Sequence, residues 1–341
     1  MTINAIINDL IKNLVRRQKD VIEARFGLLR GTKQTLAAIG RKYNLTRERI
    51  RQIEAASLNI VRKKFDDLPA KKISEAAFGE LKKFGGVRKE DDFIKDLIIL
   101  LKDNNINGRD LKFIFEVARK PEFYRGDNNY YDFWYLDKEV FKKVAGFINN
   151  LAEAIKNKKK EIVVHKKFNV FFNEVLKARG VDDKTAFNYL AISKKFKTSP
   201  FGDFGLSHWE EINPKTFRSK IYVILKRHGK PLYFREIADR INKVGFSGPI
   251  ARHRTIHNEL IKDPRFVLVG RGMYGLTEFG LEPGAAKDVI KRVLKNKGPL
   301  PREEVINLVL QERFLKPNTI LLNLQNKKHF KKLPDGRYRL A

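Results

Sequence analysis

The side chains with the clearest chemical capacity lie in the segment TRERIRQIE, residues 46–54. On a helix, Arg47, Glu48, Arg51 and Gln52 fall on one face and the apolar residues on the opposite one. Arginine can form two hydrogen bonds with guanine O6 and N7, glutamine can do the same with adenine N6 and N7, and glutamate can accept from cytosine N4. This polar face could read base edges; the alternative is that its charges form only a solvated helix surface.

The flanking sequence predicts the helices that must position this face. Apolar residues recur at helical spacing over residues 3–26, which predicts two short helices interrupted near Gly27. A helix over residues 35–43, a break at Asn44 and a long helix over residues 46–61 follow, and the Thr46 hydroxyl can cap the long helix. We expect its inward face to carry five apolar side chains, Ile50, Ile53, Leu58, Ile60 and Val61. The order is that of a helix-turn-helix.

Residues 15–65 resemble region four of the sigma-70 family of bacterial transcription initiation factors. The resemblance rests on an ARFG-type turn, the TLAAIG first helix and the TRERIRQIE recognition helix. It implies binding of the promoter −35 element in the major groove, and docking on the flap of the RNA polymerase β subunit. The implied base-contacting residues are Arg47, Glu48, Arg51 and Gln52. The implied phosphate-contacting residues are Arg41, Lys42, Thr46 and Arg49.

One departure from this family bears on function. A complete sigma factor has an upstream region that binds the polymerase clamp and flips bases of the −10 strand, whereas the sigma-like segment here begins almost at Met1. We therefore expect a chain that cannot melt a promoter unaided. This favours a regulator or an accessory subunit over an initiation factor.

The remaining sequence contains an internal repeat. The order Thr185, Asn188, Phe196, Gly202 recurs after 70 residues (255 − 185), and a third copy begins 64 residues later (319 − 255) at Thr319. Each copy reads as helices followed by a Gly-turn hairpin, with the Thr opening the third helix, which predicts winged helices. The fold class is therefore expected to be mainly α, a helix-turn-helix domain followed by tandem winged helices with small β-hairpin wings. The predicted domains are residues 1–68 (sigma-like), 70–146 (a degenerate winged helix), 147–212, 215–281 and 285–341 (winged helices).

Residues 217–280 resemble a second family, the HARE-HTH winged-helix domain, through KPLYFREIA, TIHNEL and DPRFVLVGRGMYGL. The family implies a role linked to nucleic acid or polymerase without naming a ligand. Basic and amide side chains stand at the start of the third helix and on the wing, where a groove and a flanking phosphate can be met. This second predicted DNA surface consists of Arg252, Arg254, His257, Asn258 and Arg271. The alternative is a protein-contact module with an idle basic surface.

Three features imitate other sites. Gly270, Gly272 and Gly275 spell GxGxxG, but LTEFG follows where a dinucleotide fingerprint needs a helix, so a wing hairpin is expected. His253 and His257 stand at i, i+4 without an obvious third metal ligand. The tryptophans at 134 and 209 could stack on unpaired bases, but are expected in the core. The sequence predicts no enzyme, no cofactor and no metal.

The balance of 71 Lys plus Arg against 40 Asp plus Glu leaves a net charge of +31, which calls for a polyanionic partner. Cysteine is absent, which excludes disulfides and thiolate metal sites. We expect a cytoplasmic, nucleoid-associated protein whose partners are double-stranded DNA and RNA polymerase, with no membrane and no small-molecule substrate. The first hypothesis is a DNA-binding regulator that reads a −35-like element. The alternatives are a polymerase-binding accessory or competitor with little sequence specificity, and a sequence-blind nucleoid protein.

The charge generates a first prediction. Affinity for a DNA duplex should fall steeply with salt, because bound Lys and Arg release counterions from phosphates. Titrating a labelled duplex with the chain at roughly 50 and 300 mM salt measures the effect. Equal affinity at both concentrations would contradict DNA binding by this basic chain.

Overall fold

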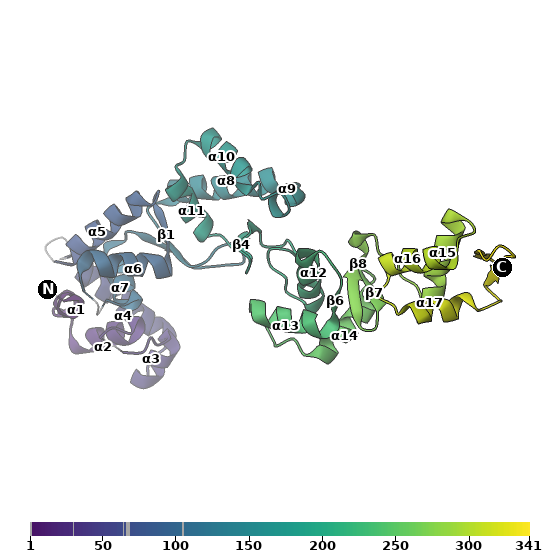
Figure 1. Ribbon diagram of the computed structural model, residues 1–341. Helices are drawn as coiled ribbons and strands as arrows, with labels where there is room; N and C mark the ends of the chain where they lie inside the picture. Colours follow the sequence, from purple (N-terminus) through teal and green to yellow (C-terminus); the bar gives the residue numbers. More distant parts are fainter. Residues whose placement is uncertain (1, 30, 64, 66–68, 104–105) are drawn as a thin grey trace. The chain divides into compact units, whose positions relative to one another are not determined.

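The computed structural model describes residues 2–29, 31–63, 65, 69–103 and 106–341. The chain divides into two compact units, residues 1–196 and 197–341, each described by itself. Both are mainly helical with small antiparallel sheets, so the predicted fold class is confirmed (Figure 1). The domain boundary predicted at residue 68 lies outside the described residues.

The first unit begins with the helix-turn-helix. Its helices are α1 (Ile3–Ile11), α2 (Arg16–Phe26), α3 (Leu36–Tyr43) and α4 (Arg47–Arg62). The predicted cap of the long helix is confirmed, since Thr46 Oγ1 accepts a hydrogen bond from the Arg49 N–H at 3.1 Å. One predicted inward residue is wrong: Ile60 is 37% exposed, and Ser57 is fully buried instead. The inward stripe of α4 runs through positions 50, 57, 58 and 61, and position 60 lies outside it.

The turn between α3 and α4 is tight. Asn44 adopts a left-handed conformation with φ of 52°, and the Leu45 N–H donates to the Gly40 carbonyl at 2.9 Å. Gly40 is needed for the close approach, because a Cβ there would lie 2.6 Å from the Leu45 carbonyl oxygen. This backbone contact sets the angle at which α4 leaves the turn.

Residues 70–135 form a winged helix in element order. The elements are α5 (Ala70–Lys83), β1 (Val87–Lys89), α6 (Glu90–Leu101), α7 (Gly108–Ala118), β2 (Glu122–Tyr124) and β3 (Phe133–Tyr135). The strands are antiparallel in the order β1-β3-β2. A single apolar cluster joins this segment to α1 and to the second half of α4, with Leu58, Val61, Phe113 and Trp134 among its members.

The next segment departs from its predicted boundary. Helix α8 (Lys138–Ile155) runs through residue 146, so no linker lies there. It continues through α9 (Lys159–Val163), α10 (Phe168–Arg179), α11 (Asp183–Ala191), β4 (Phe196–Thr198) and β5 (Phe204–Leu206). Strands β4 and β5 form a two-stranded sheet. The apolar face of α8, with Val144 and Phe147 buried, makes the helix continuous across residue 146.

The second unit holds two further winged-helix segments. The first comprises α12 (Phe217–His228), β6 (Leu232–Tyr233), α13 (Phe234–Val244), α14 (His253–Lys262), β7 (Phe266–Gly270) and β8 (Met273–Leu276), with strand order β6-β8-β7. The second comprises α15 (Ala286–Lys297), α16 (Arg302–Glu312), α17 (Pro317–Leu324), β9 (Phe330–Lys332) and β10 (Tyr338–Leu340). Thr185, Thr255 and Thr319 each occupy the third position of their helix, whereas the repeat predicted that they open it.

The two segments of the second unit are hydrogen-bonded to each other. The Phe314 N–H donates to the Val269 carbonyl at 2.7 Å, and Gly270 pairs with Phe314 as a parallel bridge. Buried Arg313 donates to the carbonyls of Glu282 and Gly284. The outer edge of β7 is therefore occupied where it meets the last segment.

Among the described residues, no helix combines the length and the apolar character that crossing a membrane requires.

The α3–α4 turn generates a prediction. Gly40→Ala should destabilise the first unit by about 1–3 kcal/mol, because its new methyl would overlap the Leu45 carbonyl. Urea unfolding is followed by the fluorescence of buried Trp134 in a Trp209→Phe background.

The matched control is Gly79→Ala in α5, where a Cβ meets nothing within 4 Å. That substitution should be neutral or stabilise by up to about 1 kcal/mol, since alanine favours helix. Equal stability changes in the two variants would refute the close approach at Gly40.

Candidate nucleic-acid interface

The predicted base-reading face of α4 is open to solvent. Arg47, Glu48, Arg51 and Gln52 are all exposed, while Ile50 on the opposite side is fully buried. Packing of Ile50 with Val21 and Ile39 orients the helix so that the polar face points outward. The four side chains therefore lie together on one surface, as the sequence predicted.

These side chains are paired among themselves. The Arg51 guanidinium donates two hydrogen bonds to the Glu48 carboxylate, at 2.8 and 2.7 Å. The Arg49 guanidinium donates to Gln52 Oε1 at 3.1 Å. The hydrogen bonds from Arg51 lower the pKa of Glu48, and Glu48 in turn raises the pKa of Arg51. The face thus carries charges held in a defined geometry instead of independently mobile ones.

The residues predicted to contact phosphate lie on both sides of the turn. Arg41 and Lys42 are exposed in the last turn of α3, and the Lys42 ammonium lies 5.5 Å from the centroid of the Tyr43 ring. The Tyr43 hydroxyl donates to Asp20 at 3.0 Å, which ties this end of α3 to α2. Arg49 is exposed, and Thr46 caps α4.

The second predicted surface is brought together only in part. Arg252, Arg254 and Asn258 are exposed at the start of α14, and Arg271 is exposed in the wing turn. His257 is partly buried instead, with its ring 4.7 Å from that of Phe234 and 5.9 Å from that of Tyr274. It packs α14 against α13 and β8. The sequence missed this because a histidine at i, i+4 from another histidine does not show which neighbour it contacts.

The third helices of the first unit are buried by their neighbours. Six residues of α7 are buried, against two in α14. Its Phe113 ring packs 5.1 Å from that of Phe26 in α2, and Arg109 donates to the Gly31 carbonyl at 2.6 Å. In α11, Asn188, which aligns with exposed Asn258, is buried and donates to the carbonyls of residues 84 and 87. These helices serve packing.

The features that imitated other sites have structural explanations. Gly270, Gly272 and Gly275 lie in the β7–β8 hairpin, and a three-residue 3₁₀ helix follows, so the wing expectation is confirmed. His253 Nε2 lies 3.0 Å from Asp239 Oδ1. Within the part of the chain that the structure describes, no group of three or more His, Cys, Asp or Glu could hold a metal ion. Trp134 and Trp209 are 3% and 5% exposed, so both are core residues.

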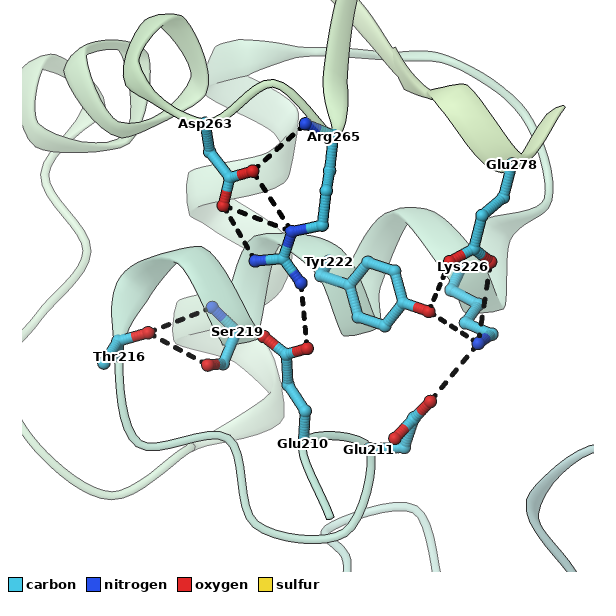
Figure 2. A network of polar contacts seen from close by, with 9 residues as sticks. All are labelled: Glu210, Glu211, Thr216, Ser219, Tyr222, Lys226, Asp263, Arg265 and Glu278. Atoms are coloured by element: carbon cyan, nitrogen blue, oxygen red, sulfur yellow. Dashed lines mark hydrogen bonds and ion pairs between the residues drawn. The ribbon is translucent and has the colours of Figure 1, made fainter. Parts of the chain in front are cut away.

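A polar network that the sequence did not predict holds residues 210–211 to α12 (Figure 2). Arg265 donates to Asp263 and, at 2.9 Å, to Glu210. The Tyr222 hydroxyl donates to Glu278 at 2.7 Å and accepts from Lys226 at 2.6 Å. Burial, the larger cause, raises the pKa of Tyr222 to about 12. No sequence signal marks these pairs, because their members are 2 to 56 residues apart and share no periodicity.

The carboxylate of Asp263 is the most constrained in the network. It is nearly buried, and the hydrogen bonds from the Arg265 side chain are the largest cause of its lowered pKa. Burial alone would raise the pKa of this carboxyl, so the arginine outweighs desolvation. The network anchors the α14–β7 turn beside the helix that carries Arg252 and Arg254.

Comparison with known protein families confirms both predicted resemblances. The family described as sigma-70, region 4 matches residues 10–63. The HARE-HTH family, described as an HTH domain of ASXL and restriction endonuclease proteins, matches residues 215–279. The first match contains all of α2, α3 and α4, and the second contains α12 to β8.

Curated relatives match the same N-terminal segment. RNA polymerase sigma factor SigA4 of Synechococcus elongatus is 46% identical over 56 residues, which make up 16% of this chain and 18% of that protein. RNA polymerase sigma factor SigA of Listeria monocytogenes is 45% identical over 56 residues, covering 16% and 15%. RNA polymerase sigma factor RpoD of Neisseria gonorrhoeae is 38% identical over 61 residues, covering 18% and 10%. The chain therefore spans less than one fifth of the length of these relatives.

The Asp263 contacts generate a pH prediction. A lowered pKa in the folded state means that ionised Asp263 stabilises the second unit above its ordinary pKa of 3.8, and that this stability is lost as the pH falls through the folded value. Asp263→Asn should therefore cost about 1–2 kcal/mol at neutral pH, and the difference from the parent should shrink below pH 3.8.

Urea unfolding followed by Trp209 fluorescence in a Trp134→Phe background measures this difference. The control is Asp335→Asn, whose carboxylate pairs with Arg337 on the exposed surface and should cost less. A cost for Asp263→Asn that is the same at both ends of the pH range would refute the assignment.

Proposed function

We propose that the chain is a sigma-like transcription regulator that binds promoter DNA through α4 and reads a −35-like element in the major groove. The observation that carries this proposal is the exposed face of α4, with Arg47, Glu48, Arg51 and Gln52 on a helix-turn-helix whose packing residues are buried behind it. The family match over residues 10–63 supports the same interpretation. Arg51 and Glu48 supply donors for guanine and an acceptor for cytosine, and Gln52 fits adenine.

The pairing within this face is compatible with base reading. Arg51 and Glu48 are 60% and 58% exposed, and solvent-exposed ion pairs contribute little to stability. Breaking the pair to form two hydrogen bonds with a base is therefore inexpensive. Until DNA arrives, Glu48 keeps the guanidinium over the helix surface, which reduces the rotamer entropy lost on binding.

The phosphate contacts would come from the flanking basic residues. Arg41 and Lys42 at the end of α3 and Arg49 on α4 lie on both sides of the turn, where the backbone of a bound duplex would pass. In the second unit, Arg252, Arg254, Asn258 and Arg271 would add contacts from α14 and its wing. Several weak modules on one chain raise the effective concentration of each.

RNA polymerase is the proposed protein partner. The printed names of the matched relatives are RNA polymerase sigma factors, and the shared segment is the helix-turn-helix. We propose contact with the β-subunit flap by the same domain. This leaves a specific alternative, an accessory or competitor protein that occupies polymerase and has little DNA sequence preference.

The test is binding of the full chain to a duplex with a −35-like hexamer and to its scrambled version. The parent should prefer the hexamer by more than about tenfold, and Arg51→Ala with Gln52→Ala should abolish that preference. Fluorescence anisotropy at two salt concentrations measures both. The loss is expected because the paired donors that distinguish bases are removed.

Arg41→Gln is the matched control. It removes a phosphate contact, so affinity should fall on both duplexes by the same factor while the preference remains. Absence of any preference in the parent, together with co-purification with polymerase, would favour the accessory protein. Uniform binding to every duplex without polymerase would favour a sequence-blind nucleoid protein.

A further inference from the structure

The hairpin at the C-terminus concentrates positive charge outside α4 and α14. Residues 326–341 carry six Lys and Arg and a single acidic side chain, Asp335. Asp335 is already paired with Arg337 at 2.7 Å. Within the described residues, no ion pair reaches the other five cations, which are Lys327, Lys328, Lys331, Lys332 and Arg339.

Strand register places two of these charges directly opposite each other. Lys331 of β9 pairs with Arg339 of β10, so their side chains leave the same face of the hairpin. The neighbouring pair, Phe330 and Leu340, turns to the other face, where Phe330 is 2% exposed in the core. Lys331 and Arg339 are both exposed on the outer face. Like charges at directly opposite positions destabilise a hairpin.

The turn before β9 orders two more cations. Asn326 Oδ1 accepts from the Lys328 N–H at 3.1 Å, and the Asn326 carbonyl accepts from the N–H groups of residues 329 and 330. This turn places Lys327 and Lys328 immediately before the strand. A groove of about 620 Å³ between the end of α17 and the hairpin is lined by Lys327, Lys331 and Arg339.

The other wing of the second unit is built differently. Strand β7 reads FVLVG, and Arg271 is its single turn cation. Its edge is occupied, because Phe314 donates to the Val269 carbonyl. Cations of that segment stand at the start of α14 instead. Conversely, α17 begins with Pro317 and exposes Leu322, which suits base reading poorly.

We propose that the C-terminal hairpin, β9 and β10 with the turn that precedes them, is a binding surface for the sugar-phosphate backbone of duplex DNA. A polyanion would relieve the repulsion between Lys331 and Arg339 and release counterions from its own phosphates. The contacts are independent of sequence, since lysine and arginine on a strand face meet phosphates and not base edges. Duplex DNA is chosen because this inference rests on the proposed function of α4.

The test removes the opposed pair in the full chain. Lys331→Gln with Arg339→Gln should weaken binding to the hexamer duplex and to the scrambled duplex by the same factor, about tenfold at roughly 100 mM salt. The slope of log affinity against log salt should fall by about 0.9 for each lost phosphate contact, or about 1.8 in total. The melting temperature of the free protein should not decrease, because the substitution relieves a repulsion.

The matched control is Lys287→Gln with Lys295→Gln on α15, two exposed lysines of the same segment. It removes the same charge and should leave the salt slope unchanged. An equal effect of both double variants, or no effect of the hairpin variant, would overturn the inference. Loss of binding to single-stranded RNA with unchanged duplex affinity would also overturn it.

The readouts separate this inference from the function of α4. Preference for the hexamer reports on Arg51 and Gln52, whereas the salt slope reports on the hairpin. A reduced slope without hexamer preference supports the hairpin and contradicts base reading. A retained preference with an unchanged slope does the reverse.

Discussion

The apolar core shared by the helix-turn-helix and the segment that follows it is the contact on which the first unit depends. It runs from Ile3 in α1 to Leu136 after β3, and includes Leu58 and Val61 of α4. The first half of α4 belongs to a smaller core, in which Ile50 packs with Val21 and Ile39. Because both halves of α4 are buried on one side, its polar side has a fixed orientation. Arg62 reinforces the joint through hydrogen bonds to the carbonyl and carboxylate of Glu116.

This core has a consequence for the winged helices. In α7 the buried side chains form most of the helix, so the element that reads DNA in many winged helices is here used to hold the helix-turn-helix. In α11, Asn188 and the Tyr189 hydroxyl bind carbonyls before β1, so this helix is also occupied. The third helices with exposed polar faces are in the second unit. The same element order therefore supports packing in one unit and open surface in the other.

Charge is distributed by the same logic. In the second unit, the Arg265 network holds the α14–β7 turn, so that turn is built from internally satisfied charges. The cations at the start of α14 and on the last hairpin remain outside such networks. Their positions differ between the two segments, because β7 is covered at its edge by residue 314 while β9 is not. A long basic chain thereby offers separate surfaces that can act together on one polymer.

Much of the fold and the α4 site followed from the sequence by itself, because the signals are local. Helical spacing, the Thr46 cap and the opposed polar face of α4 each depend on residues within one or two turns. The repeat also predicted the hairpins, since Gly272 and the strand residues around it carry turn and strand signals. Both family resemblances lie within such continuous segments.

Only the tertiary structure decided which of these elements are free. The burial of α7, the packing of His257 on Phe234, the exposure of Ile60 and the continuity of α8 through residue 146 all depend on partners distant in the sequence. The pairing of Lys331 with Arg339 likewise appears only when the strand register is known. The physical reason is that periodicity identifies a face of an element, whereas the free energy of burying that face belongs to the contact it makes.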